Sequence, residues 1–424
     1  MIQNVTHLLR ARRFMPLFAT QFLGAFNDSL FKQGVVLFVT YQLYSNAAKE
    51  FQFSAIAQGL FILPFFLFSA LAGQLADDHD KSKIIRIVKL CEIGIMILGG
   101  AGIMLANIPL MLAAVCLMGV HSTFFGPIKY AILPQHLHKD EVLGGTGLVE
   151  AGTYIAILGG TILAGILAPS PEIAAATTIG IAVLGYFAGR QVPPAPPSAE
   201  RIPFNWHIIR ASVQLVSATL HIPRLFLAIC SISFFWTIGA VLIIIFPPLV
   251  KNVLGADEQV ASLFIAIFSI GIAIGSVLIN RLLKSEVSAR YAPASVIAMG
   301  VFVLLLHFVA RAWGEHGVEL TTLGNFLFNP MAGLMILALL GVAITGGMFV
   351  VPLYAFLTTT VPKTETARTV AANNIVNSGA MVIGSLVAFA LSSAGVGPVG
   401  QLLLVASMCL VSAWLGWKLH LACD

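Results

Sequence analysis

Charged residues are scarce in this chain of 424 residues: only 10% are Asp, Glu, Lys or Arg, whereas 58% are hydrophobic. A soluble globular protein usually carries about 25% charged residues. With so little charge and a mean hydropathy of +0.94, the chain lacks the polar groups that a water-exposed surface needs. The composition therefore excludes a water-soluble enzyme and indicates a protein whose surroundings are lipid.

Several chemical motifs are also missing. The five cysteines show no CxxC spacing, so we expect neither a disulfide framework nor a metal site. No GxxxxGKS or GxxxxGKT loop is present, which argues against an ATP-driven pump. The sequence has no HxxxxD pair and no Ser-His-Asp set on a recognisable turn. We therefore expect no enzymatic activity and no cofactor.

Long apolar runs dominate what is present. A bilayer-spanning helix needs roughly 20 mostly apolar residues, and these continuous runs are too long for outer-membrane strands of about 10 residues. They predict an all-α membrane protein with twelve transmembrane helices. The approximate spans are 14–43, 52–77, 84–106, 109–133, 142–168, 171–192, 224–250, 259–284, 291–313, 331–360, 365–393 and 396–420.

Basic residues predict the orientation. With both termini cytoplasmic, 18 of the 23 Lys and Arg residues fall on the inside, and only Lys49, Lys251 and Arg311 fall outside. Lys32 and Lys129 remain within spans. This distribution agrees with the positive-inside rule, so the net charge of +5 reports orientation and does not indicate nucleic-acid binding.

A Pro-rich stretch divides the spans into two sets of six. We expect an N-terminal six-helix bundle at 1–192, a cytoplasmic linker at 193–223 and a C-terminal six-helix bundle at 224–424. The two halves show a weak repeat at an offset of 225, which aligns Pro127 with Pro352 and Gly159 with Gly384. Such a parallel repeat is typical of transporters that alternate access around a central pathway.

The first half carries charges inside its spans, where each costs at least about 2.5–3.5 kcal/mol on insertion scales. Asp28 and Lys32 share one helical face within a polar patch that includes Asn27, although a purely structural pair is an alternative. Lys129 and Tyr130 follow Pro127, and a lysine ammonium suits a phosphate oxygen. Glu150 could accept an ammonium headgroup, or it could pair with Lys129 in a structural salt bridge.

Two other polar residues receive simpler interpretations. Glu92 lies near the predicted cytoplasmic end of its span with Lys89 close by, so we expect it at the membrane interface. His121 is expected to be a hydrogen-bonded interior residue.

The second half offers no buried charge pair in its predicted spans. Its polar groups include Asn374 and Asn377, and Trp236 takes the place that Asp28 has in the first half, at an offset of 208. A charged half facing an apolar half fits an amphiphile better than a sugar. The candidate substrate-binding residues are Asp28, Lys129, Glu150, Asn27, Lys32, Tyr130, Trp236, Asn374 and Asn377.

The loop GQLADDHDKSKIIR at 73–86 resembles the signature loop of the major facilitator superfamily, except that Asp78 replaces the usual basic residue. In that family the loop acts as a gate. The matching residues are Gly73, Asp77, Lys81, Lys83 and Arg86. A solvated charged loop that only fixes orientation is the alternative.

Within that superfamily, the chain looks like the lysophospholipid transporter branch. The motifs that carry the resemblance are FLGAFNDSLFK (22–32), GQLAD (73–77), FFGPIKYAILP (124–134) and GLVEAG (147–152). It implies inward flipping of lysophospholipids such as 2-acyl-glycerophosphoethanolamine across the bacterial inner membrane, for reacylation inside. A basic residue that some members place in the seventh span has no counterpart in SFFWTIGAVLIIIF (233–246).

Two other functions stay open. A proton-coupled exporter of hydrophobic drugs or other amphiphiles would use Asp28 or Glu150 as its proton carrier. A non-transporting anchor would dock a lipid acyltransferase on the cytoplasmic face. For the lysophospholipid transporter we expect a monomer whose partners are the lysophospholipid, membrane lipid and a cytoplasmic acyltransferase or acyl-carrier-protein synthetase, with no nucleic acid.

Overall fold

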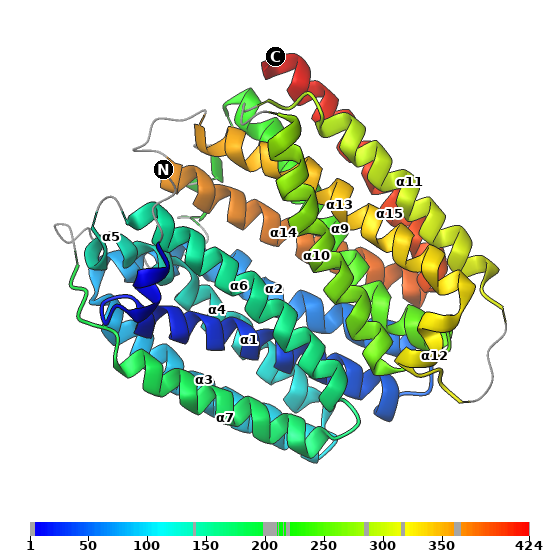
Figure 1. The fold of residues 1–424 in the computed structure, drawn as a ribbon, viewed down its shortest axis with the longest axis horizontal. Coiled ribbons are helices and arrows are strands. Elements are labelled where there is room, and N and C mark those ends of the chain that lie inside the picture. The colour runs from blue at the N-terminus through cyan, green and yellow to red at the C-terminus, as the bar shows by residue number, and fades with distance from the viewer. Residues whose placement is uncertain are drawn as a thin grey trace. The chain divides into compact units, whose positions relative to one another are not determined.

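The computed structural model describes residues 5–138, 141–197, 210, 212–214, 216–217, 221–283, 288–314, 319–359 and 366–423. Twelve long helices make up most of this part of the chain (Figure 1). They are α1 (Met15–Phe38), α2 (Ala47–Asp78), α3 (Lys81–Met104), α4 (Ile108–Ala131), α6 (Val142–Leu167), α7 (Pro171–Arg190), α9 (Pro223–Asn252), α10 (Glu258–Leu282), α11 (Ala292–Ala312), α13 (Pro330–Thr359), α14 (Thr366–Ser393) and α15 (Pro398–Cys423).

Short helices that the sequence did not predict precede or connect the long ones. They are η1 (Val5–Arg10), the π-helical turn η2 (Val39–Leu43), α5 (Leu133–His136) and α12 (Leu323–Phe328). Most of the predicted linker at 193–223 lies outside the described residues.

Eleven of the twelve long helices are apolar and long enough to cross a membrane. The remaining one, α1, has 24 residues and carries Asn27, Asp28 and Lys32 in its middle, which lower its hydropathy. Within the described residues the chain is helical, apart from one isolated bridge between Ala256 and Thr321. The predicted all-α membrane fold is confirmed, and the chain is a multi-pass membrane protein.

Local chemistry explains where several helices begin. The side chain of Asn107 accepts a hydrogen bond from Leu110 N at 3.1 Å at the start of α4, and Asp257 does the same for Val260 N at the start of α10. Such caps satisfy backbone donors that have no partner within the helix. Helices α7, α9, α13 and α15 begin at a proline, which suits the first helical position because no backbone donor is lost there.

Prolines also lie inside two helices at equivalent positions of the repeat. Pro127 is inside α4 and Pro352 is inside α13. A proline within a helix removes one backbone hydrogen bond and loosens the helix locally. The loosened turn in α4 lies close to the candidate site residues Lys129 and Tyr130.

The described chain forms two compact units. Unit 1 comprises Met1–Phe38 and Leu67–Ala211, and unit 2 comprises Val39–Phe66 and Ser212–Asp424. Helix α2 therefore contributes its first part to unit 2 and its last part to unit 1. The boundaries of two sequential six-helix bundles, drawn at 1–192 and 224–424, stay a prediction.

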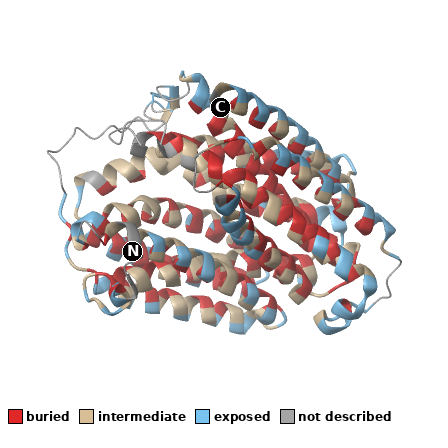
Figure 2. Cartoon of the chain, turned by 45° about the horizontal axis from the view of Figure 1, so that its top comes forward, coloured by how far each residue is buried: buried red, intermediate tan, exposed pale blue. Residues whose placement is uncertain are grey.

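Helix pairs build each unit. In unit 1, α1 packs against α6 and α7, and α3 packs against α4 and α7. In unit 2, α9 packs against α14 and α15, while α13 contacts α10 and α11. Figure 1 shows α3 beside α7 and α11 beside α15. Many helices bury one face and expose the other (Figure 2), as expected when the exposed face contacts lipid.

Helix α9 is the most enclosed of the eleven apolar spans. In its most apolar window 72% of the residues are buried, against 28% for α2. Buried side chains such as Ile238, Leu242 and Phe246 follow its whole length. We therefore expect substitutions in α9 to disturb the packing of unit 2 more than substitutions in the other spans of that unit.

A glycine permits the close approach of α6 to α1. A Cβ atom added at Gly160 would collide with the backbone carbonyl oxygen of Phe26 and lie 3.1 Å from Leu30 N. Because the obstacle is backbone, it cannot rotate away. The two helices could separate only by moving as whole elements.

We predict that Gly160→Val destabilises the protein by about 1–3 kcal/mol, the usual cost of overpacking a tight contact. Thermal unfolding of the detergent-purified protein measures this change. Gly147→Ala in the same helix is the control, because nothing lies within 4 Å of a Cβ at that position. Equal melting temperatures for Gly160→Val and the control would contradict the tight contact.

Candidate functional site

A buried ion pair lies in the interior of unit 1. Lys89 Nζ is 2.7 Å from Glu92 Oε2, and the two side chains are 0% and 1% exposed. Both residues belong to α3. Charges removed from water in this way need direct partners, because the interior offers little other stabilisation.

Two neighbouring helices complete the surroundings of Glu92. Asn27 in α1 donates a hydrogen bond to Glu92 Oε1 at 2.9 Å. His121 Nε2 in α4 lies 3.3 Å from Glu92 Oε2. The carboxylate therefore connects three helices, and the expectation that His121 is an interior residue is confirmed, since it is 5% exposed.

The expectation that Glu92 lies at the membrane interface is wrong, because helix packing encloses both Glu92 and Lys89. The reason is the small residues around Lys89. A Cβ at Gly24 would meet its ammonium, and a Cβ at Gly185 would lie 3.8 Å from it. These glycines on α1 and α7 leave a slot for the lysine side chain, and the charge spacing alone did not reveal that slot.

Asp28 lies next to this cluster but is only partly buried. Its Oδ2 accepts a short hydrogen bond from Ser122 in α4. Ser122 Oγ in turn lies 3.5 Å from His121 Nδ1. Asp28 is thus held in place by the helix that also carries Lys129, while its other oxygen, Oδ1, is buried and has no hydrogen-bond partner among the described residues. Lys32, one turn further along α1, is also partly buried.

A second carboxylate of unit 1, Glu150 in α6, accepts a short hydrogen bond from the Tyr130 hydroxyl in α4. Lys129 Nζ lies 4.8 Å from the centroid of the Tyr130 ring. In this structure Tyr130, and not Lys129, therefore bonds Glu150. All three residues are only partly buried.

The candidate residues of unit 2 form an uncharged network. Trp236 Nε1 donates to the Tyr354 hydroxyl at 2.7 Å, and Asn377 Nδ2 lies 3.4 Å from the same oxygen. Ser233 Oγ donates to Asn377 Oδ1 at 2.7 Å. Asn374 is exposed, and its side chain makes none of these bonds. Trp236 and Asn377 are brought together, whereas Asn374 stands apart.

Tyr354 is the residue that sequence reasoning missed. A signal was present, because Tyr354 lies 225 positions after Lys129, the offset of the internal repeat. Trp236 holds the position equivalent to Asp28. By these two offsets, 225 for Tyr354 and 208 for Trp236, the sequence matches a hydrogen-bonded aromatic pair of unit 2 to an ammonium and a carboxylate of unit 1.

The signature-like loop between α2 and α3 contacts the chain that follows α7. Asp80 caps α3 by accepting a hydrogen bond from Ser82 N at 2.9 Å, and it also accepts one from Ala195 N at 3.1 Å. Partial burial alone would raise the pKa of Asp80, but these hydrogen bonds lower it below its usual value. Asp80, which the motif did not single out, therefore organises this loop.

The predicted gate residues lie around this capped turn. Lys81 is buried, and its backbone N donates to Ala195 O at 3.0 Å. Lys83 and Arg86 are exposed, and Gly73 is in the last part of α2. The side chain of Asp77 lies outside the described residues. A gating role for these five residues stays a prediction.

A further charged contact joins the N-terminal segment to the start of α6. Glu141 Oε1 lies 2.7 Å from Arg13 Nη2 and 3.1 Å from the ring of His7. The backbone N–H of His138 donates to Glu141 Oε2 at 2.9 Å. These hydrogen bonds, that of His138 first, lower the pKa of Glu141 to about 2.

The arrangement of unit 1 can bind charge of both signs without any metal. Among the described residues no group of three or more His, Cys, Asp and Glu side chains could hold a metal ion. The fold is that of a helical membrane protein. The family model described as "Major Facilitator Superfamily" matches residues 17–385. The chain belongs to this superfamily, whose members are transporters and not enzymes.

Among curated proteins, the chain is similar to the "Lysophospholipid transporter LplT" of Citrobacter koseri. The two are 27% identical over 378 residues, which cover 88% of this chain and 87% of that protein. The protein of the same name from Salmonella heidelberg is 26% identical over 378 residues, covering 88% of this chain and 86% of the other.

Solved structures show the same fold at low identity. The nucleoside transporter NupG matches with a TM-score of 0.72 and 13% identity, covering 96% of this chain and 99% of that chain. A bacterial homologue of the iron transporter ferroportin matches with a TM-score of 0.68 and 14% identity, covering 96% and 98%. These likenesses establish the fold alone.

We predict that Lys89→Met destabilises the protein by about 3–5 kcal/mol, because it leaves a buried carboxylate without its cation. Adding Glu92→Gln should recover more than half of the loss, since the amide keeps an acceptor for Asn27 without the charge. Thermal unfolding of both variants measures this coupling. Lys83→Met, at an exposed position of the same helix, is the control. A double variant no more stable than Lys89→Met would contradict the ion-pair interpretation.

The lowered pKa of Glu141 predicts a pH dependence of stability. The ordinary pKa of a glutamate is 4.5, and the pKa of Glu141 in the folded protein is about 2. The contribution of Glu141 to stability is therefore complete when the pH lies above the ordinary pKa. The contribution is lost as the pH falls toward about 2, because the unfolded chain takes up the proton first. Thermal unfolding across this pH range should show that Glu141→Gln loses less stability on acidification than the unmodified protein. Glu172→Gln, at an exposed position, should leave the pH dependence of stability unchanged. Identical pH profiles for Glu141→Gln and the unmodified protein would refute the assignment.

Proposed function

We propose that this protein transports lysophospholipids, of which 2-acyl-glycerophosphoethanolamine is an example, across the bacterial inner membrane toward the cytoplasm. The observation that carries the proposal is the similarity over 88% of the chain to proteins named lysophospholipid transporter. The distribution of charge within the two units supports it independently.

A lysophosphatidylethanolamine headgroup carries a phosphate and an ammonium. Unit 1 offers a cation, Lys129, and two carboxylates, Asp28 and Glu150, all of them partly exposed. In this proposal Lys129 binds the phosphate oxygen as a compact cationic donor. Asp28 and Glu150 attract the ammonium, and the hydrogen bonds from Ser122 and Tyr130 orient these carboxylates in advance.

Preorientation matters because binding is weakened by every side chain that must be ordered on contact. Tyr130 is a rigid donor directly after Lys129, so it fixes Glu150 beside the lysine. Asn27 has another role, because it is fully buried and bonds Glu92. We therefore assign Asn27 to the support of α1 and not to direct contact with substrate.

Unit 2 supplies uncharged hydrogen-bonding groups at the equivalent positions. Trp236, Tyr354 and Asn377 form a hydrogen-bonded group that carries no charge. The acyl chain needs only apolar side chains, which every helix offers. Charged groups in one unit and uncharged groups in the other suit an amphiphile with one polar end. A sugar would need several donors from each unit.

Direction and energy source follow from the chemistry of the substrate. Both termini are proposed to be cytoplasmic, on the basis of the lysine and arginine distribution. If a cytoplasmic acyltransferase or acyl-carrier-protein synthetase consumes the lysophospholipid, its gradient alone favours inward movement, and no coupling ion is required. The transporter would work as a monomer by alternating access.

To test this function, the protein is reconstituted in liposomes and the flipping of labelled lysophosphatidylethanolamine is followed. Asp28→Asn and Lys129→Ala should each lower the rate about 10- to 100-fold, the effect of losing one hydrogen bond to a charged group. Lys418→Ala is the matched control, because Lys418 is exposed at the far end of α15. The headgroup should matter, so lysophospholipids without an ammonium should be less sensitive to Asp28→Asn.

Three outcomes would overturn parts of the proposal. Undiminished flipping in both variants would remove the site assignment. Movement of hydrophobic dyes that collapses with the pH gradient, with no lysophospholipid movement, would identify a proton-coupled exporter. No transport of either kind, together with capture of an acyltransferase, would identify an anchor.

A further inference from the structure

The short helix α12 lies between the end of α11 and the start of α13, at one end of unit 2 (Figure 1). Helices α11 and α13 are both long and apolar enough to span the membrane, and only Asn329 separates α12 from α13. A span begins where the apolar interior of the bilayer begins. The connectivity therefore places α12 at a boundary between lipid and water, which the predicted orientation assigns to the external leaflet.

One aromatic side chain fixes α12 to the interior of unit 2. Phe326 is only 1% exposed. The centroid of its ring lies 5.7 Å from that of Trp313 and 6.3 Å from that of Phe264 in α10. Phe264 in turn packs edge-on against Phe246 in α9, with centroids 5.8 Å apart. A continuous row of rings therefore connects α12 to two long helices of unit 2.

The chain that leads into α12 is bonded to the turn that follows α9. Thr321 N donates to Gly255 O at 2.7 Å, and Thr321 O accepts a hydrogen bond from Asp257 N at 3.1 Å. The indole Nε1 of Trp313 donates to Leu254 O at 3.2 Å. The turn after α9 is thus the support on which α12 is mounted.

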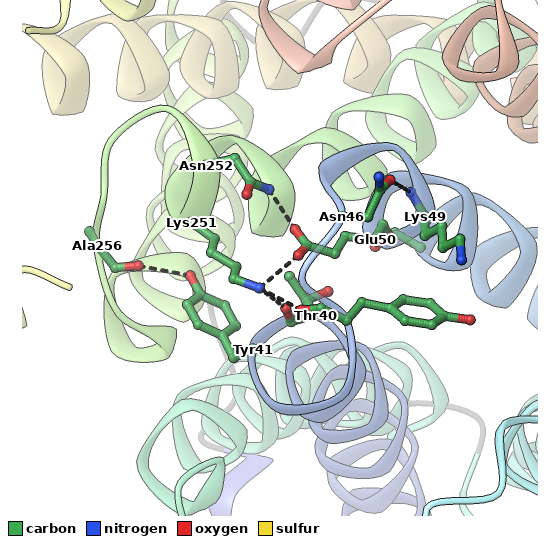
Figure 3. A network of polar contacts seen from close by, with 10 residues as sticks. Thr40, Tyr41, Asn46, Lys49, Glu50, Lys251, Asn252 and Ala256 are labelled. Carbon is green, nitrogen blue, oxygen red and sulfur yellow. Dashed lines mark hydrogen bonds and ion pairs between the residues drawn. The ribbon is translucent and has the colours of Figure 1, made fainter. Parts of the chain in front are cut away.

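Further bonds hold this support and the far end of α12. The Tyr41 hydroxyl donates to Ala256 O at 3.0 Å, from the opposite side of the turn (Figure 3). After α12, the side chain of Asn329 accepts a hydrogen bond from Met331 N at 2.9 Å and caps α13. Helix α12 is therefore fixed before its first residue and after its last.

Lys251, at the end of α9, binds the same region of the chain (Figure 3). Its Nζ donates to the backbone carbonyls of Thr40 and Tyr44, the second at 2.9 Å. It also donates to Glu50 Oε1 at 2.7 Å, so each of its three N–H groups has an acceptor. The two carbonyls lie in and just after η2, and the last carbonyls of a helix have no partner within it. Lys251 thus fixes the end of α9 directly before the turn that supports α12.

Two large apolar side chains of α12 point away from this support. Leu327 is 53% exposed, and Phe328 is 89% exposed, more than any other large hydrophobic side chain of the described residues. Successive helical residues are about 100° apart, so Phe328 points away from the buried Phe326. Leu327 and the exposed Asn325 lie on opposite flanks of the helix. Helix α12 therefore presents an apolar flank and a polar flank.

Lipid is the partner that this surface fits. Leaving a firmly held phenylalanine in water forgoes the favourable free energy of removing its ring from water. The neighbouring spans expose apolar side chains as well, since Phe308 near the end of α11 is 60% exposed and Leu334 near the start of α13 is 48% exposed. These faces contact the membrane, and α12 extends the same apolar surface to its boundary.

We propose that α12 is a membrane-interface anchor, in which Leu327 and Phe328 insert among phospholipid acyl chains just below the headgroups and Asn325 faces water. Helices of this kind bury their apolar side about 5–10 Å into the boundary between headgroups and acyl chains. Because α12 is mounted on the turn after α9 and leads directly into α13, the anchor fixes the depth of unit 2 in the bilayer.

The test uses a variant whose five cysteines are replaced by serine. Leu327→Cys, Phe328→Cys and Asn325→Cys are each labelled with bimane and reconstituted in liposomes of phosphatidylethanolamine and phosphatidylglycerol. At positions 327 and 328, brominated phospholipid should quench the label more strongly than iodide present on both sides of the membrane. Asn325→Cys is the matched control, where iodide should quench more strongly. All three positions are exposed, so the labels should leave the packing intact.

The depth of the anchor is measured with the same labelled proteins. Phospholipids brominated near the headgroup should quench the labels at 327 and 328 more strongly than phospholipids brominated near the end of the acyl chain. The bimane emission at these two positions should also lie at shorter wavelength than at position 325, because its surroundings are less polar.

Two results would overturn the anchor. Stronger quenching by iodide than by brominated phospholipid at both 327 and 328 would place α12 in water. Protection of both positions from either quencher would show that protein covers them, for example a second copy of this chain. Neither measurement involves a transported substrate, so the outcome is independent of the proposed function.

Discussion

The structure depends on the cost of placing a charge among apolar helices. Such a charge must find an opposite charge or hydrogen bonds inside the protein, because lipid offers neither. Lys89 and Glu92 meet this requirement completely, and in doing so they fix α1, α3 and α4 relative to one another within unit 1. This rigid centre is what allows Asp28 and Lys129, on two of those helices, to keep defined positions while remaining partly exposed.

Exposure separates the charges that support the fold from those that are available for function. Lys89 and Glu92 are enclosed and saturated with partners, so a ligand could gain from them only by breaking the helix packing. Asp28, Lys129 and Glu150 are only partly buried, and Asp28 Oδ1 has no hydrogen-bond partner among the described residues. The pseudo-equivalent positions of unit 2 hold Trp236 and Tyr354, which bond each other. Unit 2 therefore carries a bonded aromatic pair without charge at the positions that the sequence offsets match to Asp28 and Lys129.

Sequence reasoning predicted the twelve helices well, because a span has a minimum length and a composition that lipid enforces. It also singled out Asp28, Lys129 and Glu150 as candidates, since charges in apolar runs are conspicuous, and their role in binding stays a prediction. It failed where the answer depended on packing between helices. The slot beside Gly24 and Gly185 that encloses Lys89 is formed by three helices. The Tyr130–Glu150 bond was not predicted, because a salt bridge between Lys129 and Glu150 was the simpler expectation. The bond between Trp236 and Tyr354 joins residues 118 positions apart, so only the repeat offset hinted at it.

The same energetic rule explains why Lys251 differs from Lys89, although both are lysines that bond a glutamate at 2.7 Å. Lys89 is surrounded by helices along its length, so separating it from Glu92 would leave two charges without any solvent. Lys251 lies at the end of a span, where two of its three acceptors are backbone carbonyls at a helix terminus. The side chain of Lys251 is accordingly 16% exposed, whereas that of Lys89 is 0% exposed. Depth in the bundle, and not the identity of the pair, therefore decides how fully helix packing encloses a salt bridge.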